Sequence, residues 1–427
     1  MLTPEYLRTI TEATEKATED FNNAMVEKIV KRILALYNAT GDVKLIPSSR
    51  NDVLKMMEAG KVYEDIRDEV VKRLPDIEKE IRKAFEDASE EIRLENIRTS
   101  AEILEEPADD DVVQGSQLTE KEKRLLQRAY EATDGTIQNL TGTTASTWQT
   151  EYINACDEAY WKATHGVSMN QAVREAVDRV AKSGTRVVQY GSGHVDTIEV
   201  AIARAVRTGL NQAAAQITLQ RAAECGAEYV LVSSHLGARV TDKDEPANHY
   251  SWQGKVYHLD WKSAELEQYA PDVSASQKQK GLFARLRDKL RSFFKKKEKY
   301  PDFVKTTGYG TGEGLCGWNC RHTFSIFYPK TNENNQIQYD SEENRKAYEL
   351  SQQQRELERR IRKTKSRMYA MRTGVSEATD PDTAKTLREE ADRLHSLWER
   401  QNQDYTDFCN ANELKRLEDR LYVGKKE

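Results

Sequence analysis

The sequence has 427 residues, and none of its apolar runs is long enough to cross a bilayer. The segment LTPEYLRTITEATEK that follows Met1 lacks an apolar stretch, so we expect no secretory signal. Proline is scarce, at 9 residues, and long helices can therefore continue without interruption. These absences argue against a membrane-spanning protein and favour a chain rich in helix.

Cysteine is also scarce, and its distribution is informative. The 5 cysteines are an odd number, and they are scattered except for Cys316 and Cys320. A disulfide framework needs an even set at regular spacings, so this pattern argues against one. We therefore expect synthesis in a reducing cytosol.

What the chain does contain is charge. Charged residues make up 32% and hydrophobic residues 38%, which predicts solvated helices around a modest core. The net charge of −6 conceals local blocks of both signs, and the length suggests about two to four domains.

The first part of the chain is predicted to be helical. Apolar residues recur at steps of three to five over residues 3–37, which indicates one long helix, and a second helical block covers about 50–104 with Pro75 in a first turn. The stretch EEPADDDVVQGSQ (105–117) has five acids and no base, and we interpret it as an exposed linker.

Further helices are predicted over 118–134, where Thr119 is a plausible N-cap, and over 145–165 and 168–183. The alanine-rich stretch 195–226 is the strongest helix signal and ends at Gly226, a natural C′ residue.

The pattern then changes to α+β. EYVLVSS (228–234) is typical of a buried strand, SWQGKVYHL (251–259) of a hairpin with its turn at Gln253 and Gly254, and HTFSIFY (322–328) of a strand. From Asn344 onwards the chain is again helical, and two apolar segments predict an αα-hairpin across SEATDPD.

The predicted fold is therefore mostly α, with elongated helical arms that flank a small central α+β module. The expected regions are an N-terminal helical region at 1–104, the acidic linker at 105–117, a helical region at 118–226, the α+β module at 227–335 with a basic insertion at 274–299, and a C-terminal αα-hairpin region at 336–427.

The spacing of Cys316 and Cys320 allows two thiolates to bind one zinc ion, and His322 could add an imidazole. A fourth ligand could come from His235, His249 or His258, and we select His249, with zinc as the candidate cofactor. The alternative is structural, because small cysteines also suit a cramped corner beside Gly317.

The glycines of GYGTGEG (308–314) resemble a phosphate loop only weakly. A phosphate loop is followed by a helix and usually contains Lys-Ser or Lys-Thr, whereas this one leads into a strand. A surface loop is the simpler interpretation.

Residues 276–300 carry ten Lys and Arg against two acids, and their leucines and phenylalanines fall on one helical face. Such a segment could bind nucleic acid, lie on an anionic membrane, or pack on protein. The candidate nucleic-acid-binding residues are Arg285, Arg287, Lys289, Arg291, Lys295, Lys296 and Lys297. Residues 355–372, with eight bases and two acids, are interpreted as a solvated coiled-coil face.

Signals for catalysis are faint. TASTWQTE (144–151) contains Gln149 and Glu151 in an arrangement that only loosely resembles ADP-ribosyltransferases, and no G-x-S-x-G is present. We therefore name no catalytic residue.

The segment from Gly184 to Pro329 contains DTIEVAIARAVRTGLNQ, SSHLGAR, H-x₂-WQGKVY and TGYGTGEGLCGWNCRH. In this order they resemble the minor capsid protein 2 family of tailed phages, and more broadly the head-morphogenesis domain of Mu-type F proteins. Arg239, His249, Gly254 and Asn319-Cys320-Arg321 match the broader pattern, while His322 replaces its last cysteine and His235 an acidic position.

The resemblance implies a non-enzymatic minor head protein of a tailed phage, made in the host cytoplasm and located in the virion, in the head interior at the portal vertex. It implies portal and capsid proteins as partners, with contact to packaged double-stranded DNA. The apolar stripes of the helical arms would then be buried against a partner, most simply the portal. The alternative is a zinc-dependent nuclease or a transferase-type effector that acts during infection.

Overall fold

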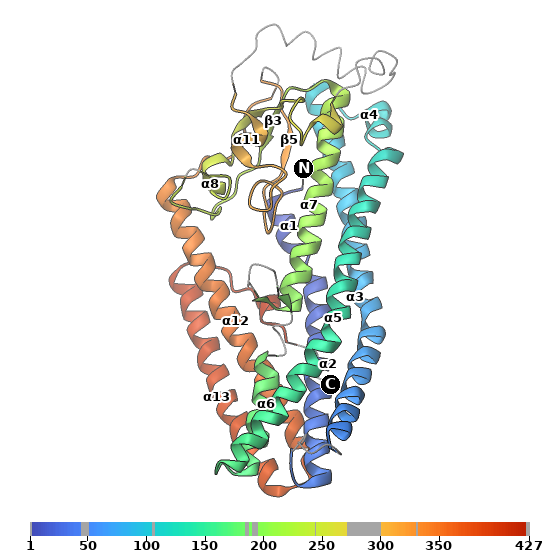
Figure 1. Ribbon diagram of the computed structural model, residues 1–427. Coiled ribbons are helices and arrows are strands. Elements are labelled where there is room, and N and C mark those ends of the chain that lie inside the picture. The colour runs from blue at the N-terminus through green and yellow to red at the C-terminus, as the bar shows by residue number, and fades with distance from the viewer. Residues whose placement is uncertain are drawn as a thin grey trace. The chain divides into compact units, whose positions relative to one another are not determined.

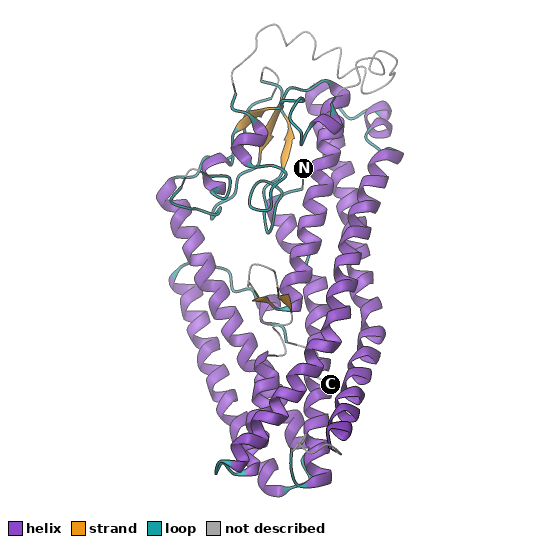
Figure 2. Cartoon of the chain, viewed as in Figure 1, coloured by secondary structure: helices purple, strands orange, loops and turns teal. Residues whose placement is uncertain are grey.

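A computed structural model describes residues 2–43, 51–104, 107–183, 188–189, 195–243, 245–270, 300–329 and 332–423. Its helices are α1 (Pro4–Thr9), α2 (Glu12–Thr40), α3 (Asn51–Leu104), α4 (Asp110–Gly115), α5 (Glu120–Thr164), α6 (Met169–Ser183), α7 (Ile198–Cys225), α8 (His249–Trp252), α11 (Phe303–Thr307), α12 (Ser341–Glu377) and α13 (Pro381–Ala411). Its strands are β1 (Val188–Gln189), β2 (Val195–Asp196), β3 (Tyr229–Val232), β4 (Val256–His258) and β5 (Phe324–Ile326). The mostly helical fold with a small sheet is confirmed (Figures 1 and 2).

The chain forms two compact units, and each combines segments that are distant in the sequence. The sheet unit contains Met1–Thr11, Ile81–Asp134 and Arg204–Ser351, and the helical unit contains Glu12–Glu80, Gly135–Ala203 and Gln352–Glu427. The boundaries between the units fall inside α3, α5, α7 and α12.

The sheet unit is built around three antiparallel strands in the order β4-β3-β5. Because side chains alternate along a strand, Val230 and Val232 face one side of β3 and pack with Leu219 of α7, while Tyr229 and Leu231 pack on the other side. Both faces of β3 are therefore buried, which explains its uninterrupted apolar sequence.

The ends of α5 and α7 follow the predicted signals. Thr119 and Glu122 form a reciprocal capping box, in which the Glu122 amide donates to the Thr119 hydroxyl (3.2 Å) and the Thr119 amide donates to the Glu122 carboxylate (2.7 Å). Gly226 has a φ of +68° after α7, and the Ala227 amide donates to the carbonyl oxygen of Ala222 at 2.8 Å. These are the features of a Schellman cap, so Gly226 ends the helix as expected.

Four local predictions are wrong. Residues 3–37 form two helices, because the chain turns at Ile10 and Thr11 between α1 and α2. Pro75 lies inside the 54-residue α3 and not in a first turn. The segment predicted as an exposed linker contains α4, where Asp109 caps the helix and Val112 is buried.

The fourth error is the predicted hairpin at 251–259. The first part of this segment is the short helix α8, and β4 pairs with β3 across the sheet. Gly254 does adopt a turn conformation, with a φ of +67°, but its amide donates to the carbonyl oxygen of Ser233. The turn therefore directs β4 against β3 instead of folding it back on its own residues.

The helical unit buries apolar stripes of its own. Phe21, Met25, Ile29 and Ile33 of α2 are fully buried, and α2 packs on α6. The expectation that the stripe of this helix is reserved for a partner is wrong, because the stripe forms part of the core.

The helical unit contains α12 from Gln352 onwards and the whole of α13. The two helices lie side by side as the predicted αα-hairpin (Figure 1). Ile361, Tyr405 and Cys409 pack together, and the Tyr405 hydroxyl donates to the Glu358 carboxylate at 2.9 Å. Gln354 donates to the Tyr405 hydroxyl at 3.1 Å, so a polar network joins the two helices across their apolar contact.

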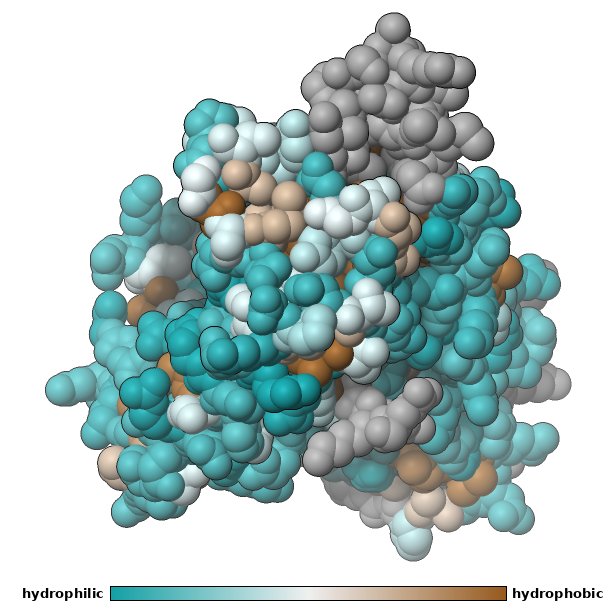
Figure 3. Space-filling model, turned by 90° about the horizontal axis from the view of Figure 1, so that it is seen from below, coloured by the Kyte–Doolittle hydropathy of each residue, from teal (hydrophilic) through white to brown (hydrophobic). Residues whose placement is uncertain are grey.

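The face drawn in Figure 3 is mainly hydrophilic, with small, separate apolar patches. Within the described residues, none of the helices combines the length and the apolar character that crossing a membrane requires.

Candidate metal centre

The glycine-rich loop at 308–317 folds back on its own backbone. The Leu315 amide donates to the Thr307 carbonyl oxygen at 2.9 Å, and the Trp318 amide donates to the Gly312 carbonyl oxygen at 2.7 Å. A Cβ atom at Gly314 would overlap the Gly308 carbonyl oxygen, and one at Gly317 would lie 2.6 Å from the Thr311 carbonyl oxygen. The glycines therefore permit close packing of backbone against backbone, and these amides face carbonyl groups and not an anion.

The end of the loop is held in an unusual conformation. Cys316 and Asn319 have φ values of 60° and 57°, in the left-handed region that non-glycine residues adopt infrequently. The side-chain amide of Asn211 on α7 donates to the carbonyl oxygens of Cys320 (3.1 Å) and His322 (3.0 Å). This buried asparagine fixes the direction in which the chain leaves the loop.

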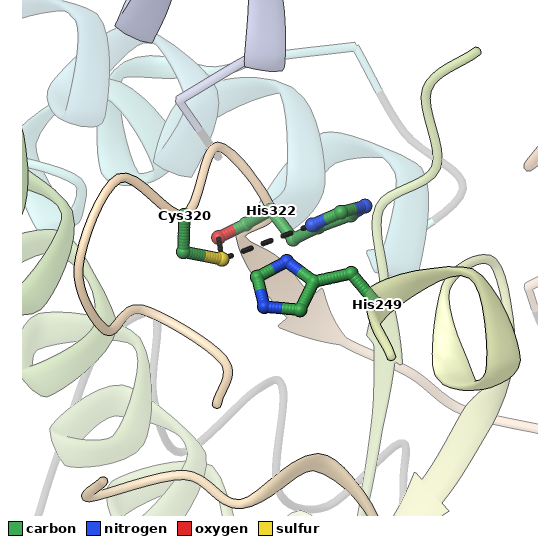
Figure 4. Close-up of side chains that lie close together, drawn as sticks. All are labelled: His249, Cys320 and His322. Carbon is green, nitrogen blue, oxygen red and sulfur yellow. Dashed lines mark hydrogen bonds between the residues drawn. The ribbon is translucent and has the colours of Figure 1, made fainter. Parts of the chain in front are cut away.

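Three potential metal ligands lie close to one another beside this loop. One ligand atom each from His249, Cys320 and His322 lies within 4.8 Å of the other two, and all three residues are buried. Figure 4 shows the two imidazole rings and the thiol turned toward one another. We refer to these three residues as the His–Cys–His cluster.

Each histidine of the cluster has a hydrogen-bond partner on its outer side. Nε2 of His249 lies 2.9 Å from the carbonyl oxygen of Glu313, and Nε2 of His322 lies 3.0 Å from Oε1 of Gln253. Nδ1 of His322 lies 3.7 Å from Sγ of Cys320, on the inner side. The rings also contact Trp252, which lies 4.8 Å from His322 between ring centroids.

Burial sets the protonation states in the cluster. It lowers the pKa of His249 to about 4, although the hydrogen bond to the Glu313 carbonyl oxygen opposes this shift. Burial also holds the pKa of His322 well below its usual value and raises the pKa of Cys320 to about 11. At neutral pH both imidazoles are therefore neutral, and neutral imidazoles are competent metal ligands. The cluster could hold a metal ion.

The structure selects one of the histidines that we considered as a further ligand. His249 joins Cys320 and His322, as predicted, whereas His235 stacks on the His322 ring at 4.4 Å and His258 contacts Tyr229. Cys316 is not among the three converging residues, and its Sγ lies 3.7 Å from the carbonyl oxygen of His322. The assignment of all four residues as metal ligands stays a prediction.

Sequence reasoning missed the residues that support the cluster. Gln253, Asn211 and the Glu313 carbonyl group contact it through hydrogen bonds, and none of them is a usual ligand type. Asn211 carried a signal, since it is a polar residue on an alanine-rich helix.

The candidate nucleic-acid-binding residues, Arg285, Arg287, Lys289, Arg291, Lys295, Lys296 and Lys297, lie outside the described residues, as does the whole predicted insertion at 274–299. The second basic stretch lies on α12, and several of its charges are engaged there. Arg359 and Arg360 pair with Glu356, and Arg367 pairs with Asp178 at 2.6 Å.

The faint transferase signal has no supporting structure. Residues 144–151 lie within α5, where Trp148 is fully buried and Glu151 is 3.6 Å from Arg179. A buried aromatic residue and an ion pair on a helix are ordinary features of a helical core.

Comparison with known proteins places these features in a wider context. A family model described as phage minor capsid protein 2 matches residues 2–405. A structural protein of Lactococcus phage mv4 is 39% identical over 72 residues, which cover 17% of this chain and 58% of that protein. The aligned part thus spans somewhat more than half the length of this relative. No solved structure matches the chain.

Proposed function

Because the chain belongs to the phage minor capsid protein 2 family, we propose that it is a structural head component, present in few copies and attached to the portal in the head interior. The family establishes a minor capsid protein of a phage, and the match to a phage structural protein agrees with this. Attachment to the portal, the position in the head and the absence of enzymatic activity are our proposals.

The observation that carries a structural role is the closed environment of the His–Cys–His cluster. A catalytic zinc site keeps one coordination position open to water, commonly with a carboxylate close enough to act as a base. The converging group contains no Asp or Glu among the described residues, and all three of its side chains are buried. Such a cluster joins α8 to the loop before β5 and offers little access to a substrate.

Virions purified before and after DNA ejection test this role. We expect quantitative mass spectrometry to find the chain in purified virions at a ratio to the major capsid protein that matches the portal. We also expect chemical cross-links between the chain and the portal. Absence from virions, or cross-links to tail proteins alone, would contradict the proposal.

Nuclease activity is the contrasting function, and it can be tested directly. Purified chain supplied with Zn²⁺ should leave duplex and single-stranded DNA intact, while a commercial nuclease serves as the positive control. DNA cleavage that disappears in a His249→Ala variant would support the enzymatic alternative instead.

We also propose contact with packaged DNA through residues 276–300. Ten bases within this short segment can neutralise several phosphates, and the release of condensed counterions favours such binding. The basic stretch of α12 is a weaker candidate, because Arg359, Arg360 and Arg367 are already paired with carboxylates.

A further inference from the structure

We propose that the His–Cys–His cluster binds one Zn²⁺ ion, with Nδ1 of His249, Sγ of Cys320 and Nδ1 of His322 as ligands and Cys316 as the fourth. This goes beyond the proposed role in the head, since a structural protein can perform that role with or without a metal. The inference rests on which ring nitrogens are free, on the spacing of the ligand atoms, and on the position of the second sulfur.

The hydrogen bonds determine which nitrogen of each ring carries the proton. A backbone carbonyl oxygen can only accept, so Nε2 of His249 must donate to Glu313, and Nδ1 keeps its lone pair. For His322 the partner is Oε1 of Gln253, which also accepts from the His235 amide at 3.0 Å. That amide can only donate, so the Gln253 atom at this position is the oxygen and the His322 Nε2 must donate to it.

Both histidines therefore present Nδ1 with a free lone pair, and both are fixed by an acceptor on the opposite ring nitrogen. This is the arrangement that metal-binding histidines show, in which the second ring nitrogen donates to a carbonyl or carboxylate group. Figure 4 marks the contact between the sulfur of Cys320 and the ring of His322, with the ring of His249 beside them.

The spacing of the ligand atoms is close to that of an occupied site. Zinc bonds of about 2.0–2.3 Å around a tetrahedral ion place neighbouring ligand atoms roughly 3.3–3.8 Å apart. The distance from Cys320 Sγ to His322 Nδ1 is already 3.7 Å, and the largest separation in the cluster is within 4.8 Å. A contraction of about 1 Å, by rotation of side chains, would bring the three atoms around one ion.

Cys316 is the candidate for the fourth ligand. Its Sγ lies 3.7 Å from the carbonyl oxygen of His322, and Sγ of Cys320 lies 3.8 Å from the same oxygen. Both sulfurs therefore lie near this oxygen, and Cys316 is buried, although its Sγ does not converge with the other three ligand atoms. A structural zinc site has four protein ligands, and a set of two thiolates and two imidazoles is a common one. Binding releases the thiol protons to solvent, and the metal replaces them.

Metal titration of the full chain tests the site. The purified protein is stripped with a chelator and titrated with Zn²⁺, and then with Co²⁺, whose visible spectrum reports tetrahedral geometry and thiolate bonds. We expect one equivalent of either ion, a cobalt spectrum with thiolate charge-transfer bands, and a melting temperature that falls on chelation and recovers with Zn²⁺. Less than about a fifth of an equivalent, or a melting temperature unaffected by chelation, would overturn the proposal.

Variants separate a metal site from a packed, metal-free cluster. Cys320→Ser should abolish the cobalt charge-transfer bands or weaken binding at least tenfold, and Cys316→Ser should weaken it while one equivalent still binds. His258→Asn and Cys409→Ser are the matched controls, because His258 contacts Tyr229, Cys409 packs with Ile361, and neither belongs to the cluster, so both variants should bind as the parent does. Equal losses in the controls, or unchanged cobalt spectra in Cys320→Ser, would contradict the assignment.

The tautomer argument has its own test, which does not depend on whether a ligand variant folds. Gln253→Leu removes the acceptor that holds the His322 proton on Nε2, and loss of such a partner commonly weakens metal binding by about 10–100-fold. Gln253→Glu keeps an acceptor and should restore most of the affinity. If both variants bind Zn²⁺ with the affinity of the parent, the hydrogen bond does not select the ligand nitrogen and this part of the assignment is wrong.

Discussion

At the scale of single residues, the helical unit contains a buried pair of acids, Glu19 and Glu199. Burial and the repulsion between the two carboxylates raise the pKa of Glu19 to about 8, and burial also raises the pKa of Glu199. Arg362 opposes both shifts. The side-chain amide of Asn22 donates to the Glu199 carboxylate at 3.3 Å.

This pair predicts that the helical unit loses stability as the pH rises. The unfolded chain releases the Glu19 proton near the ordinary pKa of 4.5, whereas the folded chain retains it up to about 8. Between these values the folded state binds the extra proton, so stability falls with pH by at most about 1.4 kcal/mol per unit, and it levels off above 8.

Glu19→Gln should remove much of this slope and raise the urea midpoint at pH 8. The exposed Glu27, which pairs with Lys31 on the same helix, provides the matched control Glu27→Gln. Urea unfolding followed by circular dichroism between pH 5 and 9 measures the effect. A slope in Glu19→Gln equal to that of the parent would show that Glu19 is ionised in the folded chain.

A second residue-scale prediction concerns the glycine-rich loop at 308–317, beside the His–Cys–His cluster. In Gly317→Ala the new Cβ would meet the carbonyl oxygens of Thr311 and Gly312, which are backbone atoms of a tight loop and cannot turn away. We expect a loss of more than about 1 kcal/mol in stability. Gly60→Ala is the control, because Gly60 lies in α3 with open space around it and should gain about 0.5–1 kcal/mol. Thermal unfolding of both variants measures the change in stability. An unchanged stability in Gly317→Ala would mean that the loop can relax around the added Cβ atom.

At the scale of elements, the N-terminal segment is an integral part of the sheet unit. Leu2 and Leu7 are fully buried, and the Thr323 hydroxyl donates to the Leu2 carbonyl oxygen at 2.7 Å. Arg207 of α7 donates to the Leu7 carbonyl oxygen at 2.9 Å and to the Thr11 hydroxyl at 2.8 Å. Removing this segment should therefore damage the sheet unit and not only a contact with a partner.

Leu7→Ala tests the role of this segment with a single change. Deletion of a fully buried leucine side chain commonly costs about 2–5 kcal/mol, through lost burial and the cavity that remains. Leu94→Ala, at a leucine of the same unit that is 36% exposed, should cost far less. Chemical denaturation compares the two variants, and equal losses would show that α1 contributes little to the core.

We predict that the basic segment at 276–300 binds duplex DNA in a salt-dependent manner. The logarithm of affinity should fall with the logarithm of salt concentration by about 0.9 per phosphate contact, with little dependence on DNA sequence. Replacing Lys295, Lys296 and Lys297 with Gln should reduce this slope by the contribution of up to about three phosphate contacts. Fluorescence anisotropy with duplex DNA between 50 and 200 mM salt measures it.

The control for this experiment is a triple variant with the same change of charge elsewhere. Lys121, Lys123 and Arg124 are exposed at the start of α5, and their replacement with Gln should leave the salt dependence nearly unchanged. If the two triple variants behave alike, the effect reflects net charge and residues 276–300 are not the DNA contact.

How far the sequence predicts this structure depends on whether the deciding contact is local. Thr119 and Gly226 act on neighbouring residues, and the helix ends that they predict are correct. Gln253 and Gly254 were misread as a hairpin turn, because the strand that pairs with β4 lies more than twenty residues earlier, in β3. The same holds for the candidate site. Residue type allowed His249 as one of three histidines, but the hydrogen bonds of Gln253 and Asn211 depend on distant parts of the chain.

At the scale of the whole molecule, the large exposed apolar side chains are few and scattered over the described residues. Trp161 and Trp318 are the largest of them, at 59% and 60% exposed, while the stripe of α2 is buried within the chain. Single exposed apolar side chains of this kind are ordinary on protein surfaces. We therefore expect the chain to fold before it joins the head.

The purified chain should unfold cooperatively, show a strongly helical circular dichroism spectrum and remain monomeric at micromolar concentration. Light scattering after size-exclusion chromatography and calorimetry provide the measurements. Binding of a hydrophobic dye without a cooperative transition, reversed on adding portal protein, would instead indicate that folding depends on the partner.

The bond between Thr323 and Leu2 joins residues that are 321 positions apart, and this has a consequence for biosynthesis. A bacterial ribosome adds about 5–20 residues per second, so roughly 15–65 s pass between the synthesis of the first partner and that of the second. During this interval the Leu2 carbonyl oxygen lacks its Thr323 partner, whereas the hydrogen bonds of a long helix such as α2 are local and can form as soon as the helix leaves the ribosome. Closure of the sheet unit is therefore among the last steps in the production of the chain.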